Sequence, residues 1–351
     1  MLKVGVIGGG SISEYHLKPY FENPNVEIVA ICDSDERRLH ALGKKYCVEN
    51  LYLKVSEFLA NEEIDAISIC TWNNSHAEIA IQALQMNKHV LLEKPLSLSL
   101  DEAYAVEAAV KESGKILQVG YVRRFATNVG VLKKFIDAGE LGEIYYAKAS
   151  CIRRLGNPGG WFSDIKKSGG GPLIDLGTHM IDLCWYLMGK PKPISVSGNT
   201  YKKLGNRAHI ENLSFYKAAD YDAEHNDVED LANALIRFEN GASLYVDVSF
   251  TLHAKQDEVS VKLYGENGGA EVEPELAIVK EQHETILNIT PQIDLLSFDF
   301  AGSFINEINH FVDCCINNVQ PISTVEDGVE VTKMLAAIYE SAATNQEKNC
   351  R

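Results

Sequence analysis

The amino-terminal residues combine an apolar segment with a glycine-rich turn. Residues 2–7 read LKVGVI, the pattern of a buried strand, and residues 8–13 read GGGSIS. This is the motif G-x-G-x-x-G with Ser13 in the third glycine position. In this motif the first two glycines permit a tight turn and a close approach of the backbone to a pyrophosphate, and the third permits close packing of a helix on a strand. The sequence therefore predicts a dinucleotide-binding domain at the start of the chain.

A second apolar segment supports this prediction. Residues 26–32 read VEIVAIC and are followed by Asp33. An acidic residue at the end of the second strand accepts hydrogen bonds from the adenosine ribose and repels the 2′-phosphate of NADP, so Asp33 favours NAD. Arg37 and Arg38 weaken this preference because an arginine pairs well with a phosphate. The alternative for both arginines is a solvated helix face, which fits Arg37 better, and NADP stays open as the second cofactor.

Strands and helices continue to alternate as far as residue 119. The predicted elements are strands at 66–70, 89–92 and 115–119 and helices at 75–86 and 101–113. This order predicts a doubly wound parallel sheet in residues 1–122, and ligands of such sheets bind beyond the carboxyl ends of the strands. Polar residues follow two of these strands: residues 71–74 (TWNN) with His76, and Glu93-Lys94-Pro95. A lysine directly after a buried strand is either an ordinary loop residue or a ligand contact.

After residue 125 the pattern changes to strands that follow one another. The predicted strands are at 144–153, 194–201, 234–238, 242–250 and 259–264. The dipeptide Asn240-Gly241 is a tight-hairpin signal, so residues 123–351 are predicted to form an α+β domain with a large, mainly antiparallel open sheet. A helix at 172–188 would cover part of one face, and we expect subunits to pair through the other face as a homodimer or homotetramer. A capping box at Ser323 and Glu326 predicts a last helix at about 324–343.

Four polar residues interrupt the otherwise apolar helix predicted at 172–188. They are Asp175, Thr178, His179 and Asp182. Spacings of three and four residues place them on one side of the helix. A polar stripe on a buried helix is either hydrogen-bonded to the protein or lines a wet cleft. The residues alone therefore allow two interpretations, a structural Asp–His pair and a functional site.

Charge and composition exclude several classes of partner. A chain of 351 residues with a formal net charge of −16 lacks the basic surface that nucleic acid or an anionic membrane requires. No run of 18 apolar residues predicts a membrane span, and the first residues lack the pattern of a signal peptide. The eight cysteines form no CxxC pair and no zinc spacing. We therefore expect a cytoplasmic protein without a structural metal that acts on a small molecule.

Together these motifs resemble, in order and spacing, those of the glucose–fructose oxidoreductase / inositol dehydrogenase (Gfo/Idh/MocA) family. The matching segments are GGGSIS with His16, Asp33, Thr71 to His76, Glu93-Lys94-Pro95, residues 120–125 (GYVRRF), and Gly169 to Asp182. The resemblance extends to residues 326–342 and so covers essentially the whole chain. Two departures, Ser13 for a usual Gly or Ala and Trp72 where proline is common, both lie on the cofactor side.

This resemblance implies a Rossmann domain, an α/β domain with a large open sheet, and a tightly held nicotinamide cofactor that oxidises or reduces a carbinol carbon. In the family the last helix packs back on the first domain. Lys94 corresponds to the lysine of the family's E-K-P motif, and Asp175 and His179 correspond to its D-x-x-x-H pair. We interpret His179 as general acid or base, Asp175 as the residue that orients it or binds a substrate hydroxyl, and Lys94 as the group that stabilises alkoxide charge. All three are expected to converge beside the nicotinamide.

The complete set of expected contacts follows from the motifs and the resemblance. The residues expected at the cofactor are Gly8, Gly10, Ser11, Ile12, Asp33, Arg38, Thr71, Trp72, Asn73, His76, Glu93 and Lys94. The residues expected at the substrate are Lys94, Arg153, Trp161, Asp175 and His179. Trp161 either stacks on a sugar or the nicotinamide, or anchors its own glycine-rich loop. Residues 206–230 are polar and aperiodic, and form either a lid or a substrate-selecting insertion.

The hypothesis that follows is an NAD-dependent oxidoreductase that acts on a secondary alcohol or ketone of a sugar, glycoside or cyclitol. Two alternatives remain: a reductase of a non-sugar carbonyl or dihydrodiol-type substrate, and a catalytically silent NAD-binding regulator. The fold is common to all three.

Overall fold

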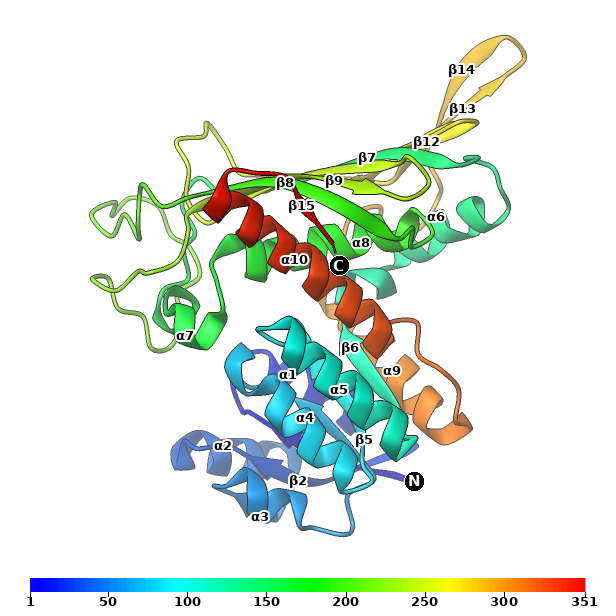
Figure 1. Cartoon of the computed structure of the whole chain (residues 1–351). Helices are drawn as coiled ribbons and strands as arrows, with labels where there is room; N and C mark the ends of the chain where they lie inside the picture. The colour runs from blue at the N-terminus through cyan, green and yellow to red at the C-terminus, as the bar shows by residue number, and fades with distance from the viewer. Residues whose placement is uncertain (351) are drawn as a thin grey trace. The chain divides into compact units, whose positions relative to one another are not determined.

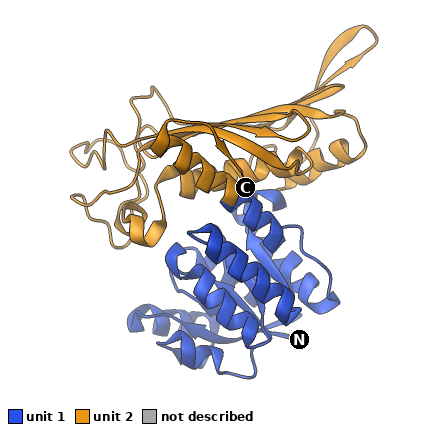
Figure 2. Ribbon diagram, viewed as in Figure 1, with its two compact units in different colours: residues 1–125, 300–332 blue, residues 126–299, 333–351 orange. Residues whose placement is uncertain are grey.

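The computed structural model describes residues 1–350, and the chain divides into two compact units (Figure 2). Unit 1 comprises residues 1–125 and 300–332, and unit 2 comprises residues 126–299 and the chain from Lys333 onward. Each unit has its own sheet and its own core. No helix within residues 1–350 is long and apolar enough to span a membrane.

Unit 1 contains a six-stranded parallel sheet with the strand order β3-β2-β1-β4-β5-β6. Its strands are β1 (Leu2–Ile7), β2 (Val26–Cys32), β3 (Asn50–Tyr52), β4 (Ala66–Ile69), β5 (His89–Glu93) and β6 (Leu117–Gly120). Its helices are α1 (Ser13–Glu22), α2 (Glu36–Tyr46), α3 (Val55–Leu59), α4 (His76–Gln85), α5 (Leu100–Ser113) and α9 (Phe300–Asn317), with the short turns η1 (Asn73–Ser75) and η2 (Val122–Phe125). From β1 the first strands are added on one side as far as β3, and the later strands, β4 to β6, are added on the other side of β1. This reversal of the strand order confirms the predicted doubly wound fold.

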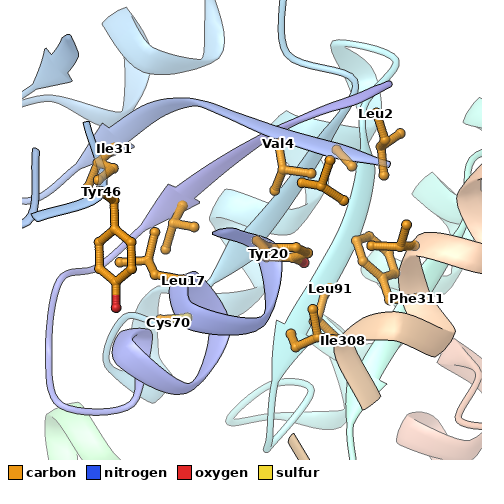
Figure 3. Close-up of a cluster of buried hydrophobic side chains, with 14 of the residues drawn as sticks. Leu2, Val4, Leu17, Tyr20, Ile31, Tyr46, Cys70, Leu91, Ile308 and Phe311 are labelled. Atoms are coloured by element: carbon orange, nitrogen blue, oxygen red, sulfur yellow. The ribbon is translucent and has the colours of Figure 1, made fainter. Parts of the chain in front are cut away.

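The core of unit 1 forms where α1, α2 and α9 cover one face of the sheet (Figure 3). Leu17 and Tyr20 from α1 meet Ile308 and Phe311 from α9, and all four are fully buried. Helix α9 is a part of unit 1 that we did not predict from the sequence. Its apolar residues recur at helical spacing, so it completes the cover of a sheet whose last strand already ends at Gly120.

The last helix, α10 (Val325–Thr344), begins in unit 1 and ends in unit 2. The predicted capping box at Ser323 and Glu326 is wrong by one residue. Thr324 and Asp327 exchange the two capping hydrogen bonds, each at 3.3 Å. The Ser323 hydroxyl instead donates to the carbonyl oxygen of Val119 at 2.6 Å, which extends the edge of β6.

Unit 2 contains a nine-stranded sheet in the order β14-β13-β12-β11-β7-β10-β9-β8-β15 (Figure 1). Its strands are β7 (Ile144–Ile152), β8 (Pro193–Tyr201), β9 (Leu231–Phe238), β10 (Ser243–Ser249), β11 (Glu258–Gly265), β12 (Gly268–Glu273), β13 (Ala277–Gln282), β14 (Thr285–Ile289) and β15 (Lys348–Asn349). Its helices are α6 (Thr127–Asp137), α7 (Ile165–Ser168) and α8 (Thr178–Leu187), with the turns η3 (Gly160–Ser163) and η4 (Leu173–Gly177). Only β7 and β10 pair in parallel, so the mainly antiparallel sheet is confirmed.

Helices cover one face of this sheet. Helix α8 packs on β7, β10 and β11, and the Ser341 hydroxyl of α10 accepts the Gly198 N–H of β8 at 2.9 Å. Along β9 and most of β10 buried residues alternate with more exposed ones, as expected where a single face is covered. The predicted hairpin at Asn240-Gly241 joins β9 to β10, and Gly241 has φ +85°.

The predicted helix at 172–188 differs from a regular α-helix at its start. Residues Leu173–Gly177 form a π-helical turn, and only Thr178–Leu187 are α-helical. The Thr178 N–H donates to the Leu173 carbonyl, five residues back. Gly177, a weak helix former, stands at the junction of the two parts. Single π-helical turns within α-helices are frequent at functional sites, and this one contains Asp175.

Candidate active site

The glycine turn after β1 has the geometry of a phosphate cradle. Gly8 has φ +92°, and a Cβ atom there would lie 2.6 Å from the carbonyl oxygen of Cys70, so the turn itself requires glycine. A Cβ atom at Gly10 would meet no protein atom within 4 Å. The protein's own packing therefore leaves open space above Gly10, as a backbone that receives a pyrophosphate requires. Ser13 is fully buried, and its hydroxyl donates to the Gly10 carbonyl at 2.7 Å.

Asp33 lies at the end of β2 beside this turn. Its carboxylate is buried and accepts the Gly9 N–H at 2.5 Å and the Asp35 N–H at 2.7 Å. Arg38 donates to the same carboxylate through Nε at 3.2 Å and Nη2 at 3.0 Å, whereas Arg37 is exposed on α2. The predicted difference between the two arginines is therefore present in the structure. Asp33 and Arg38 thus form an ion pair directly beside the glycine turn.

The residues that follow β4 are held together by buried hydrogen bonds. The imidazole of His76 contacts the Pro95 carbonyl through Nδ1 at 2.8 Å and the Thr71 carbonyl through Nε2 at 3.1 Å. Burial lowers the pKa of His76, and a neutral imidazole has one N–H, so it donates to only one of them. His76 thus connects the segment after β4 to Glu93-Lys94-Pro95. Trp72 is 45% exposed and Asn73 is buried.

Glu93, the last residue of β5, takes part in a second buried network. Its carboxylate lies 2.9 Å from Nε2 of His16, and Nδ1 of His16 lies 3.1 Å from the Ser68 hydroxyl. Tyr20 completes the chain through a 2.8 Å hydrogen bond between its hydroxyl and that of Ser68. The matching segments of the sequence included His16 but gave it no role. Its contacts identify it as the residue that fixes Glu93 and thereby the strand end that carries Lys94, which is half-buried.

In unit 2 the polar stripe separates into two pairs. Thr178 and Asp182 are buried, and the Thr178 hydroxyl donates to the Ile174 carbonyl at 2.7 Å within its own helix. Asp175 and His179 are half-buried. The four residues are therefore not equivalent, and Asp175 and His179 are the members of the stripe that retain access to solvent. Lys94 belongs to unit 1, so its convergence with them stays a prediction.

The two predicted substrate loops of unit 2 are internally bonded. Arg153 donates to the Gly156 carbonyl at 3.2 Å, and the ring of Trp161 lies 3.9 Å from that of Phe162. Residues 206–230 contain no helix or strand, yet Asn206 is buried and donates to three carbonyls of its own loop, those of Asp222, Ala223 and His225. The stretch is thus an ordered loop, and its role as lid or insertion stays open.

A cluster of three polar residues in unit 2 has a structural explanation. Asp164, His225 and Asp227 hold ligand atoms within 4.8 Å of one another. Asp164, however, accepts the Lys166 N–H and pairs with Lys167 at 3.3 Å, and Asp227 accepts the Ile165 N–H at 2.7 Å. These bonds tie α7 to the long loop, and we assign no metal there.

In unit 1 a hollow also lies at the amino-terminal edge of the sheet, opposite the edge where ligands of this fold bind. The ammonium group of Lys88 in this hollow donates to the carbonyls of Asn61 and Ile64 at 2.8 and 3.0 Å. Burial lowers the pKa of Lys88, whose charge connects two loops of the protein. The polar lining of this hollow therefore has a structural explanation.

Comparison with known proteins gives two matches to family models. Residues 2–121 match the model described as "Oxidoreductase family, NAD-binding Rossmann fold", and residues 133–349 match "Oxidoreductase family, C-terminal alpha/beta domain". The chain belongs to the Gfo/Idh/MocA family. Membership confirms the resemblance drawn from the motifs. As a Gfo/Idh/MocA protein the chain is an NAD(P)-dependent oxidoreductase that acts on CH–OH groups, and its first unit contains an NAD-binding Rossmann domain.

Curated relatives within the Gfo/Idh/MocA family are similar over nearly their whole length. The D-glucoside 3-dehydrogenase of Escherichia coli (strain K12) is 31% identical over 350 residues, which cover 98% of this chain and 96% of the relative. The scyllo-inositol 2-dehydrogenase (NAD(+)) of Bacillus subtilis (strain 168) is 30% identical over 357 residues, with 99% and 94% coverage.

The solved structure of levoglucosan dehydrogenase in complex with NADH has the same fold. It aligns with a TM-score of 0.86 over 100% of this chain and 99% of that chain, at 23% identity. The likeness shows that this chain shares the fold of that structure.

Proposed function

We propose that this protein transfers a hydride between NAD and a secondary alcohol or ketone carbon of a sugar, glycoside or cyclitol. The observation that supports this best is the π-helical turn before α8, which leaves Asp175 and His179 accessible while the other members of the polar stripe are buried. The two curated relatives, a glucoside dehydrogenase and an inositol dehydrogenase, support the substrate class.

The residues of unit 1 fit the cofactor. The open space above Gly10 suits a pyrophosphate, and the carboxylate of Asp33 suits a ribose diol. We assign Gly8, Ser11, Ile12, Thr71 and Asn73 to the same cofactor edge because they stand at the ends of β1 and β4. When bound, NAD supplies the hydride acceptor.

The protein's own part in the reaction is to position the substrate and move a proton. Oxidation of a carbinol requires that the hydroxyl proton leave, and an imidazole nitrogen of His179 takes it, or returns it in reduction. Asp175, four residues earlier, orients that imidazole or binds a neighbouring hydroxyl. Lys94 donates a hydrogen bond to the reacting oxygen and stabilises the negative charge that develops on it. Arg153 and Trp161 are assigned to the remainder of the substrate.

A spectrophotometric screen tests the proposal. NAD and NADP are each offered with inositols, aldoses and glycosides, and formation of the reduced cofactor is followed by absorbance. We expect reduction of NAD by at least one polyol or glycoside. Tight binding of NADH without turnover of any polyol, keto-sugar, dihydrodiol or other carbonyl compound would instead favour a regulatory protein, and turnover of only non-sugar carbonyls would favour the alternative reductase.

Asp33 provides a prediction about cofactor choice. Substitution Asp33→Asn keeps one oxygen for the Gly9 N–H but removes the charge that opposes a 2′-phosphate, while Arg38 remains. Hydrogen bonds to a charged group contribute about 1.5–3 kcal/mol, so we expect the ratio of kcat/KM for NAD to that for NADP to fall about 10- to 100-fold. The matched control is Arg37→Ala on the exposed face of α2. A wild-type enzyme that already prefers NADP would contradict the assignment.

The uncovered face of the sheet in unit 2 supports the proposed homo-oligomer. Three tyrosines gather there: the rings of Tyr146 and Tyr264 stack at 5.5 Å, and Lys148 lies 5.8 Å from the ring of Tyr245. We propose that this face pairs with a second copy of the chain. Tyr264→Glu is then expected to lower the mass measured by light scattering, whereas Tyr104→Glu, at a residue of unit 1 with the same 40% exposure, leaves it unchanged. A wild-type protein that is monomeric at micromolar concentration would refute the pairing.

A further inference from the structure

Glu229 lies at the end of the long loop of unit 2 and is buried. Oε2 accepts the Gly171 N–H at 2.9 Å, and Oε1 accepts the Leu173 N–H at 3.1 Å. Pro172 between them has no N–H, so one carboxylate accepts both hydrogen bonds that this corner of the backbone can donate.

The carbonyls of these two residues accept hydrogen bonds from the π-helical turn and from the start of α8. The Gly171 carbonyl accepts the N–H of Asp175 at 3.0 Å, and the Leu173 carbonyl accepts the N–H of Thr178, the neighbour of His179. Glu229 therefore anchors, from the amino side, both residues whose carbonyls fix the backbone at Asp175 and at Thr178. A negative charge at the start of a helix is also favoured by the direction of the peptide dipoles.

Two of the three glycines before the turn, Gly170 and Gly171, fit this arrangement. A Cβ atom at Gly171 would lie 2.4 Å from the Glu229 carbonyl oxygen, and one at Gly170 would lie 2.0 Å from the Tyr339 hydroxyl. Side chains at these positions would displace the carboxylate or its partner. The hydroxyl of Tyr339, on α10, donates to Oε1 of Glu229 at 2.9 Å. Burial, and then the charge of Glu229, raise the pKa of Tyr339 well above its usual value, so it remains a donor throughout the neutral range.

Asp230, the residue after Glu229, connects the two ends of the long loop. Asp230 is buried, and its carboxylate accepts the N–H groups of Lys203, Leu204 and Gly205, the last at 3.0 Å. Its own N–H donates to the Tyr201 carbonyl at 2.7 Å. Asp230 thus joins the start of the loop, at residues 201–205, to its end, directly beside Glu229.

We propose that Glu229 is a positioning residue. It holds the π-helical turn, which carries Asp175 and leads into the first residues of α8 with His179, in its working geometry, and it connects that turn to the loop at 206–230. This inference rests on the proposed function of Asp175 and His179. It assigns Glu229 no contact with substrate or cofactor. A displacement of about 1 Å of a reacting group can lower the rate about 100-fold, so the loss of this anchor is expected in kcat rather than in cofactor binding.

The test compares Glu229→Ala, Glu229→Gln and a matched control, Glu239→Gln, whose residue is exposed in the hairpin between β9 and β10 of the same unit. We expect Glu229→Ala to lower kcat about 100-fold at a temperature well below its Tm, with the dissociation constant of NADH unchanged. Glu229→Gln keeps one carbonyl oxygen and is expected to recover part of this loss. The control is expected to match the wild type. A residue that serves only stability would lower Tm and leave kcat of the folded fraction unchanged, which would overturn the proposal.

Amide hydrogen exchange tests the anchor without any substrate. In Glu229→Ala the peptide covering residues 169–179 is expected to exchange faster than in the wild type, while peptides of unit 1 exchange as before. Unchanged exchange in this peptide would overturn the anchoring role. If the wild-type enzyme turns over no polyol, the proposed function fails while the exchange result still decides whether Glu229 holds the turn, so the two failures are distinguishable.

Discussion

Substitution of His179 by alanine is expected to lower kcat about 10²- to 10⁴-fold, the range that general acid–base catalysis typically contributes. The reacting hydroxyl would lose the group that takes its proton, while the glycine turn and Asp33 in unit 1 would be unaltered. The dissociation constant of NADH, measured by fluorescence titration, is therefore expected to remain that of the wild type. The loss should appear in both directions of the reaction, because the same imidazole returns the proton in reduction.

The control for this experiment is His40→Ala. His40 lies on α2 of unit 1, its side chain is 65% exposed, and its Nε2 lies 3.8 Å from the Glu36 carboxylate. It should retain wild-type turnover. A fall of less than about tenfold in His179→Ala would leave general base catalysis by this residue without support. Loss of NADH binding in the same variant would show that the substitution disturbs folding or cofactor binding rather than proton transfer.

Substitution of Gly10 by alanine is expected to abolish much of the NAD affinity without any cost in stability. The added methyl group meets no protein atom within 4 Å, so Tm should change little. It would, however, occupy the space assigned to the pyrophosphate. Overpacking of a close contact costs about 1–3 kcal/mol, which corresponds to a dissociation constant about 5- to 150-fold weaker. Gly8→Ala should differ, since its φ of +92° and the nearby Cys70 carbonyl strain the turn itself.

Gly130→Ala is a matched control for this prediction. Gly130 lies on α6, and a Cβ atom there also meets nothing within 4 Å. Both substitutions add one methyl group to open space, and only Gly10 is assigned to the cofactor. Equal NAD affinity of the two variants would refute the placement of the pyrophosphate at the turn after β1.

The fold of unit 1 was predictable because its signals are local. Strands β1 and β2 have the bounds that their apolar segments predict, since each is continuous and ends at a turn residue. The short strand β3 (Asn50–Tyr52) has too few apolar residues to stand out. Helix α9 has a clear helical period, but which sheet it covers depends on contacts between residues about 300 positions apart. The capping box is a similar case, because STVED contains two overlapping signals and the long-range bond of Ser323 to Val119 decides between them.

The candidate site was predictable only in part. The spacing of Asp175, Thr178, His179 and Asp182 placed four polar residues together, and the same spacing fits an α-helix and a π-helical turn. Only the structure shows that Thr178 and Asp182 are buried whereas Asp175 and His179 are half-buried. Glu229 has no local signal at all, because it stands in a polar stretch and reaches Gly171, 58 positions earlier, only in the folded chain. His16 likewise acquires its role from Glu93, 77 positions later.

The most direct test of the proposed function is the fate of the carbinol hydrogen. Glucosides and inositols deuterated at the ring carbinol carbons are incubated with the enzyme and NAD, and the reduced cofactor is analysed by mass spectrometry. Our account predicts NADH that carries one deuterium, in amounts that fall with the lower turnover of His179→Ala. Absence of deuterated NADH with every labelled glucoside and inositol, from an enzyme that binds NADH, would contradict it.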